Sequence, residues 1–169
     1  ATSGAFCHWV YANETDGNVI ACSPTQVDDG GAYELLYSAN GTISAGLGKY
    51  TGADGVLPLT SGGALTAPDN QLNLSGWPTF SLPGDIDAAQ AKELLKYQLV
   101  LATGTINDNG FLAVTGTELQ TPGALDDLYA AAAANAVLGV DYSTGAPVAR
   151  VWAPTALSVA LNVYDTSDA

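Results

Sequence analysis

Two adjacent acid pairs, Asp28-Asp29 and Asp126-Asp127, are the first residues in this sequence whose types suggest chemistry. Neighbouring residues on a helix point about 100° apart, so Asp126 and Asp127 are poorly placed for joint acid and base catalysis. We interpret them as first-turn residues that complement a helix dipole. Asp28-Asp29 precedes two glycines without the spaced acid ligands of a cation site, which favours a solvated turn. No catalytic or metal-binding residue is predicted.

Histidine and tryptophan are the remaining candidates for a site. His8 is the only histidine, and no serine or second cysteine accompanies it as a triad would require, so we interpret it as a strand residue without a catalytic role. Trp9 has apolar neighbours, and Trp152 precedes Ala-Pro and is interpreted as a packing residue. Trp77 follows a polar loop and precedes a proline, which makes it the best candidate for an exposed ring. It is the one predicted carbohydrate-binding residue.

The composition restricts the classes of partner. The chain has 169 residues, of which 47% are hydrophobic and 12% charged, and its formal net charge is −13. Such a negative charge disfavours a phosphate backbone, so nucleic acid is not expected as a partner. The sequence lacks an apolar run of about 18 residues, so no membrane span is expected. Neutral ligands such as sugars are compatible with this surface, because they bind through stacking and hydrogen bonds.

Sequence patterns in the first half predict mostly strands. "AFCHWVYA" and "NVIACS" flank the turn residues of "NETDG" and predict a hairpin. "YELLYS" alternates, and Asn40-Gly41 after it predicts a two-residue hairpin turn. Residues 45–76 are rich in Gly, Ser and Thr and predict an irregular loop with a short strand at 56–59. "WPTFSLP" predicts a strand whose two prolines restrict it to an edge or to strand ends.

The second half combines helices with two further hairpins. "DIDAAQAKELLKYQ" predicts a helix capped by Asp85 or Asp87, and residues 99–119 predict a strand, a turn and a strand. An alanine-rich stretch beginning at "TPG" predicts a short helical connector. "PVARVWAPTALSVALNVYD", residues 147–165, predicts a last hairpin with its turn at 153–155.

Whether the two cysteines can form a disulfide depends on the register of the first hairpin. If Tyr11 faces Asn18, the numbers of facing residues add to 29, which places Cys7 opposite Cys22. A tight turn at Asp16-Gly17 would instead place Cys22 opposite Tyr11 and keep the thiols apart. The facing register permits a disulfide without ensuring it.

Two of these stretches together resemble a known junction. "GTELQTPGALDDLYA" followed by "VARVWAPTALSVALNVYD" is similar to the start of the family-48 carbohydrate-binding-module sandwich in pullulanase-type starch debranching enzymes, which include the plant limit dextrinases of glycoside hydrolase family 13. "HWV", "GNVIA", "YELLYSANG", "WPTFSLP" and "LLKYQLVLAT" occur upstream in the order expected of the same enzymes, so the resemblance covers nearly the whole chain.

The resemblance implies a non-catalytic N-terminal portion of an enzyme that hydrolyses α-1,6 branch linkages in starch, pullulan or limit dextrins. Catalysis would then lie on an (α/β)₈ barrel whose motifs this sequence does not contain. The implied partners are an α-glucan, bound through the parent enzyme, and the remainder of the sandwich and barrel. No cofactor is expected in this chain, and calcium is the candidate for the parent enzyme.

The resemblance to plant members implies a plastid, with a secreted bacterial enzyme as the alternative. A plastid would keep Cys7 and Cys22 as free thiols. Two other functions are considered: a freestanding carbohydrate-binding module for α-glucans, and a structural β-sandwich without a ligand. An intact second domain would favour the free module.

The expected fold is mainly β. It consists of an N-terminal β-sandwich-like domain over residues 1–120 with one or two short helices, a helical connector over 121–144, and the opening hairpin of a second β-sandwich over 145–169. A hairpin alone is marginal in water, so this last segment is expected to need a packing partner.

Overall fold

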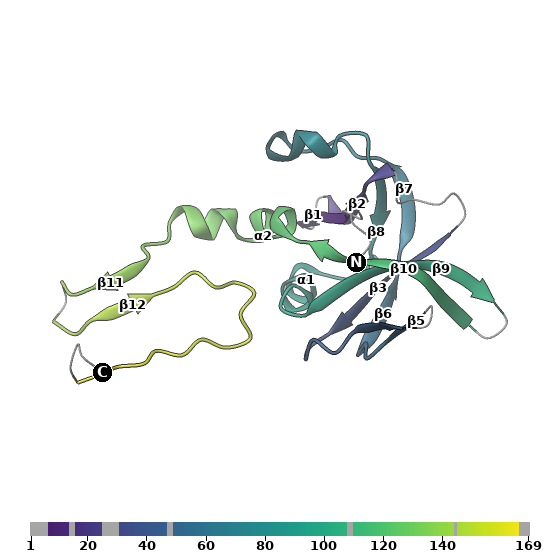
Figure 1. Cartoon of the computed structure of the whole chain (residues 1–169). Coiled ribbons are helices and arrows are strands. Elements are labelled where there is room, and N and C mark those ends of the chain that lie inside the picture. The colour runs from purple at the N-terminus through teal and green to yellow at the C-terminus, as the bar shows by residue number, and fades with distance from the viewer. Residues whose placement is uncertain are drawn as a thin grey trace.

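Twelve short strands dominate the computed structural model, which describes residues 7–13, 16–24, 31–46, 49–107, 110–143 and 145–165 (Figure 1). The strands are β1 (Cys7–Asn13), β2 (Gly17–Cys22), β3 (Ala32–Ser38), β4 (Ser44–Gly46), β5 (Lys49–Thr51), β6 (Gly55–Pro58), β7 (Thr60–Ala64), β8 (Pro78–Ser81), β9 (Gln98–Asn107), β10 (Gly110–Gln120), β11 (Gly139–Asp141) and β12 (Val148–Arg150). The helices are α1 (Ala88–Leu94), α2 (Pro122–Ala134) and the 3₁₀ segment η2 (Asp69–Leu74). The predicted mainly β fold with short helices is confirmed.

Eight of the strands form one continuous sheet in the order β6-β3-β9-β10-β1-β2-β8-β7. Tyr33 on β3 and Phe80 on β8 are five strand positions apart in this order, about 24 Å in a flat sheet. Their ring centroids nevertheless lie 4.3 Å apart. The sheet therefore folds back on itself, and its two halves face each other across a core as in a sandwich.

The core draws on both halves of the sheet and on both α-helices. Trp9, Leu35 and Phe80 are almost completely buried, and Leu94 of α1 and Ala124 of α2 belong to the same cluster. Alternation along β3 explains its share, because Tyr33 and Leu35 point to one face of the strand. In the described part of the chain, no helix is long and apolar enough to cross a bilayer.

The first hairpin has the register that places the cysteines opposite each other. Cys7 faces Cys22 and Trp9 faces Ile20, so the residue numbers add to 29, as in the first of the two registers that the sequence left open. A bulge after Trp9 then shifts the register, and Tyr11 faces Val19 in place of Asn18. The structure joins Cys7 and Cys22 in a disulfide, so the expectation of two free thiols is wrong here.

Asn40-Gly41 forms a turn but not the predicted hairpin. The Gly41 N–H donates to the Ser38 carbonyl at 3.5 Å, yet β3 pairs with β6 and β9 and not with the strand that follows the turn. The tight-turn signal was therefore correct, whereas the pairing was decided by distant strands. The strand, turn and strand predicted over 99–119 is confirmed by the β9–β10 pair, although residues 108 and 109 of its turn lie outside the described residues.

Residues 45–76 are more ordered than the predicted irregular loop. They contain β5, β6, β7 and η2, together with part of β4; β6 lies close to the strand predicted at 56–59. β6 pairs with β3, β7 pairs with β8, and β4 and β5 pair with each other. The side chains of β7 are exposed along its whole length. A strand exposed on both faces has no hydrophobic alternation, so the sequence pattern could not reveal it.

The predicted restriction of "WPTFSLP" to strand ends is confirmed. β8 lies inside the sheet between β2 and β7, with Pro78 as its first residue and Pro83 beyond its end. The prolines therefore interrupt no interior ladder bond. Helix α1 is also confirmed: the Asp87 side chain accepts from the Gln90 N–H at 2.8 Å, and the Gln90 side chain accepts from the Asp87 N–H at 2.9 Å. This reciprocal pair is a capping box.

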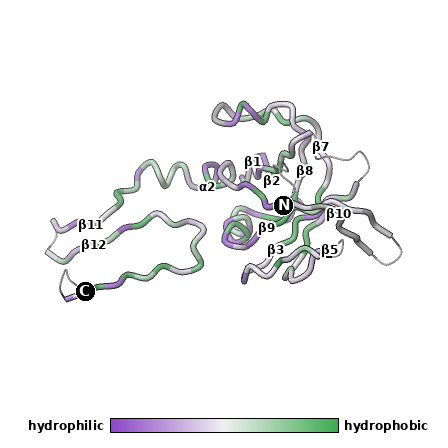
Figure 2. The backbone as a smooth tube through the Cα atoms, in the orientation of Figure 1, coloured by the Kyte–Doolittle hydropathy of each residue, from purple (hydrophilic) through white to green (hydrophobic). Residues whose placement is uncertain are grey.

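The predicted hairpin over residues 147–165 is wrong. Its first strand exists as β12, but β12 pairs with the preceding β11, and residues 151–165 form no strand. A turn is present, since the Ala156 N–H donates to the Ala153 carbonyl at 3.1 Å. Figure 1 shows β11, β12 and the following segment extending away from the sheet, and Figure 2 shows hydrophobic residues recurring along it. Leu161 and Val163 are 73% and 84% exposed.

The hydrophobicity of residues 151–165 alternates as in a strand. Among the described residues, however, no neighbouring strand pairs with this segment and no apolar layer covers it, so it does not form a strand. The division into 1–120, 121–144 and 145–169 stays a prediction.

We expect the disulfide to contribute substantially to stability. Replacing both cysteines, Cys7→Ala with Cys22→Ala, opens a loop of 15 residues and should lower the free energy of unfolding by about 3 kcal/mol. Urea unfolding monitored by tryptophan fluorescence measures the change. Reductant should destabilise the wild-type chain and leave the variant unaffected. Equal stability of the oxidised wild-type chain and the variant would contradict the expectation.

Residues 151–165 should exchange their amide hydrogens far faster than residues 99–102 of β9. The former have no strand partner in the structure, whereas β9 is hydrogen-bonded on both sides by β3 and β10. Hydrogen exchange read by NMR or mass spectrometry measures both segments in one sample. Protection of residues 151–163 equal to that of residues 99–102 would show that the segment is paired.

Candidate functional site

Trp77 is less exposed than the sequence suggested. It lies just before β8, is half-buried, and packs on a small cluster formed by Val10, Ala21, Leu65 and Leu74. Its ring meets the His8 ring edge-on, with centroids 5.8 Å apart. The backbone is also held, because the Trp77 carbonyl accepts from the Leu65 N–H at 2.8 Å. Contact between Trp77 and a glucan stays a prediction.

His8 lines a cavity of about 300 Å³ with Gln71, Asn73 and Asp126. Burial lowers the pKa of the His8 imidazole, which favours the neutral ring. The adjacent Cys7 is in the disulfide and offers no thiolate. The residues that line this cavity include no serine, threonine or free cysteine that could act with His8 as a nucleophile.

Asp126 and Asp127 fall in the second turn of α2 and not in the first, because the helix starts at Pro122. The predicted dipole role is therefore wrong, although Asp127 does have a structural contact. Its Oδ2 accepts from the Ala12 N–H at 2.8 Å and from Asn13 Nδ2 at 2.6 Å. These bonds attach α2 to the end of β1.

The backbones of α2 and β1 also approach each other closely where the helix packs on the strand. Gly123 of α2 is buried, and a Cβ there would lie 2.9 Å from the Trp9 carbonyl oxygen. A larger residue would push the helix away from β1.

The other two tryptophans differ in environment. Trp9 is completely buried, and its Nε1 donates to the Tyr11 carbonyl at 2.8 Å. Trp152 is 41% exposed and meets Tyr129 of α2 edge-on, with centroids 5.8 Å apart. The Lys92 ammonium lies 5.2 Å from the centroid of the same Tyr129 ring. Trp152 thus contacts the helix as a packing residue would.

An open groove between α1, β3 and β6 is a site that the sequence analysis missed. Its volume is about 280 Å³, and two tyrosines, Tyr37 and Tyr97, line it with their planes 22° apart and their centroids 6.2 Å apart. Other lining residues are Leu57, Ile86, Gln90 and Glu93.

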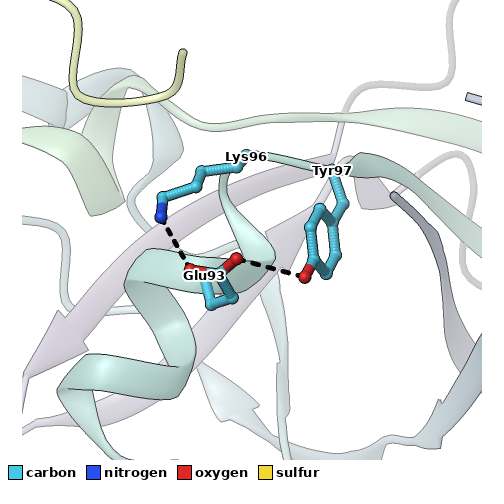
Figure 3. A network of polar contacts seen from close by, with 3 residues as sticks. All are labelled: Glu93, Lys96 and Tyr97. Carbon is cyan, nitrogen blue, oxygen red and sulfur yellow. Dashed lines mark hydrogen bonds and ion pairs between the residues drawn. The ribbon is translucent and has the colours of Figure 1, made fainter. Parts of the chain in front are cut away.

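Each tyrosine is held by its neighbours. Tyr37 faces Gly55 in the register of β3 and β6, and a Cβ at Gly55 would overlap the Tyr37 hydroxyl. Glycine therefore leaves room for this ring to lie across β6. The Tyr97 hydroxyl donates to Glu93 Oε1 at 3.2 Å, as Figure 3 shows.

Glu93, which lines the groove, also forms a salt bridge with Lys96. Lys96 Nζ lies 2.7 Å from Glu93 Oε2, and both side chains are partly exposed. Hydrogen bonds from Lys96 and Tyr97 lower the pKa of the Glu93 carboxyl and keep it ionised at neutral pH. The groove thus presents two aromatic faces beside a hydrogen-bond acceptor.

Sequence reasoning missed the groove because Tyr37 and Tyr97 are distant in the chain. The one signal was the alternation that places Tyr37 on the same face as Tyr33 and Leu35. The pairing of β3 with β9, in which Tyr37 faces Leu99, is what brings Tyr97 near.

No metal centre is apparent in the part of the chain that the structure describes. There, no group of three or more His, Cys, Asp or Glu side chains has the arrangement of a metal site. Asp28-Asp29 lies outside the described residues, so its interpretation as a turn stays a prediction.

Comparison with known proteins identifies the family. Residues 5–127 match the family model of the pullulanase N2 domain. The chain belongs to the pullulanase N2 domain family. The match runs from just before β1 into α2, so the folded-back sheet, the Tyr37–Tyr97 groove and the α2 docking contact all lie within the N2 domain.

Relatives of this N2 domain chain are much longer proteins. It is 35% identical over 166 residues to a pullulanase from Klebsiella pneumoniae, which covers 95% of this chain and 14% of the relative. The structure resembles PulA from Klebsiella oxytoca with a TM-score of 0.67 and 28% identity over 90% of this chain and 13% of that one. The structure also resembles a maltotriose complex of PulA from Klebsiella pneumoniae, with a TM-score of 0.67 and 27% sequence identity, over 90% of this chain and 15% of that one.

Removing the Asp127 carboxylate should loosen α2 from β1. We expect Asp127→Ala to lower the free energy of unfolding by about 1 kcal/mol, because two hydrogen bonds to a charged but exposed acceptor are lost. Asp85→Ala removes the same charge at another exposed position and should change stability by less than about 0.5 kcal/mol. Urea unfolding compares them, and equal losses would argue against the docking role.

Proposed function

We propose that this chain is the non-catalytic N-terminal portion of an enzyme that hydrolyses α-1,6-glucosidic linkages in starch, pullulan or limit dextrins. The observation that carries the proposal is the family match together with 35% identity to a pullulanase along 95% of the chain. The chain spans about one-seventh of the length of that relative, which leaves room for a separate catalytic domain. Catalysis would belong to that domain.

The exposed segment after α2 supports a further packing partner. Val151, Leu157, Leu161 and Val163 are each at least 64% exposed, and β-strand alternation recurs around them. Contiguous exposed apolar residues of this kind mark interaction sites in soluble proteins. In the proposed enzyme this segment begins a family-48-type carbohydrate-binding sandwich that adjoins the catalytic barrel, and the remainder of that sandwich covers it. A freestanding module would leave the segment uncovered.

The proposed compartment is oxidising. The Cys7–Cys22 disulfide favours the secreted bacterial enzyme over the plastid, because disulfides persist where thiols are not kept reduced. The identity to a Klebsiella pullulanase also supports a bacterial-type parent over a plant limit dextrinase. Calcium remains our proposal for the parent enzyme, bound outside the residues described here.

Hydrolysis assays test the proposal. The 169-residue chain incubated with pullulan should release no reducing ends above a buffer control, whereas the protein encoded by the full reading frame should release them. Linear amylose, which lacks α-1,6 linkages, is the matched substrate control. Release by the chain itself, abolished by changing one of its carboxylates, would overturn the non-catalytic assignment; a full-length protein inactive on pullulan would overturn the debranching assignment.

A further inference from the structure

The Tyr37–Tyr97 groove has the chemistry of a sugar-binding site. Aromatic side chains offer flat apolar faces, and the apolar C–H face of a pyranose ring packs well on such a surface. The two tyrosine rings line the groove as a near-parallel, stacked pair, with planes 22° apart and centroids 6.2 Å apart, and we call this pair the aromatic wall of the groove. A groove of about 280 Å³ is near the lower limit of small-molecule sites, which suits a short stretch of an oligosaccharide.

The wall is held in place before any ligand arrives. The Tyr97 hydroxyl is fixed by Glu93, and the Tyr37 ring occupies the space that Gly55 leaves open. The backbone beneath is also rigid, because β3 is hydrogen-bonded to both β6 and β9. Preorganised rings reduce the conformational entropy that binding would otherwise lose.

Polar groups stand at the edge of the wall. Gln90 and Glu93 are three residues apart on α1 and therefore share one face of the helix. The capping contact of Gln90 uses its Oε1, so its Nε2 protons are not needed for that contact. Glu93 presents carboxylate oxygens that accept hydrogen bonds. Donor and acceptor groups beside aromatic faces match the hydroxyl groups of a sugar.

The negative charge of the groove and of the whole chain favours a neutral ligand. Glu93 is exposed at the groove, and the whole chain has a net charge of −13, so phosphates, nucleotides and acidic peptides would be repelled. The Lys96 ammonium is already paired with Glu93. A neutral carbohydrate satisfies the aromatic faces and the polar groups without any charge of its own.

We propose that the Tyr37–Tyr97 groove is an accessory subsite for a short stretch of α-glucan, with the rings stacking on sugar faces and Gln90 and Glu93 bonding to hydroxyl groups. The choice of α-glucan among neutral carbohydrates rests on the function proposed above. The subsite increases the residence of the enzyme on a polymeric substrate and takes no part in bond cleavage.

Affinity electrophoresis of the 169-residue chain through gels containing pullulan tests the subsite, with polysaccharide-free gels as reference. The wild-type chain should be retarded. Tyr37→Ala and Tyr97→Ala should each weaken binding about tenfold, because each removes one stacking face. Tyr97→Phe keeps the ring and should weaken binding less than Tyr97→Ala. Tyr142→Ala, which removes a tyrosine that is 73% exposed and far along the chain, is the matched control and should bind like wild type.

Folding controls and one further variant distinguish loss of binding from loss of folding. Far-UV circular dichroism and thermal unfolding confirm that each variant is folded, and Gly55→Ala provides a variant that displaces the Tyr37 ring without removing an aromatic group. Loss of binding in Gly55→Ala would support the subsite.

Unretarded migration of the wild-type chain, or loss of binding in Trp77→Ala with Tyr97→Ala unaffected, would overturn it. If the chain fails to bind while the full-length protein hydrolyses pullulan, the subsite fails and the proposed function stands.

Discussion

The parallel pairing of β1 with the end of β10 is the contact on which the rest of the fold depends. It joins Cys7 and His8 to Leu119 and Gln120, which are more than a hundred residues away, over only two registered pairs. On one side of it lie β2, β8 and β7, and on the other β9, β3 and β6. Without this pairing the two halves of the sheet would be separate ribbons, each with an apolar face in water.

The same pairing positions the helices. Because α2 starts two residues after β10, the pairing delivers it beside β1, where Asp127 bonds to the strand and Gly123 allows close approach. The disulfide joins β2 to β1 at Cys7, the end of β1 that pairs with β10, whereas Asp127 bonds near the other end of β1. Three constraints of different kinds, a strand ladder, a carboxylate contact and a covalent bond, therefore converge on one short strand.

Two surfaces of this molecule differ in how far their apolar side chains are buried. At the Tyr37–Tyr97 groove, apolar rings are half-buried and held by a polar network, which is the arrangement of a ligand site. Along residues 157–163, apolar side chains are exposed at every second position, which is the arrangement of a surface that another protein layer covers. A pullulanase N2 domain that both contacts a glucan and adjoins further domains would need one surface of each kind.

The sequence by itself determined the local elements that carry strong patterns. A helix capped near Asp87, the β9–β10 hairpin and the placement of Pro78 at a strand end all follow from short-range chemistry. For the two cysteines the sequence left two registers open, and the structure has the facing one. Only the tertiary structure decided the rest. β7 has no hydrophobic period and exists because β8 offers a backbone partner. Tyr37 and Tyr97 meet because β3 pairs with β9. Alternation over residues 147–165 predicted a hairpin, yet a strand needs a neighbouring backbone as well as a pattern, and that neighbour is a property of the assembled fold.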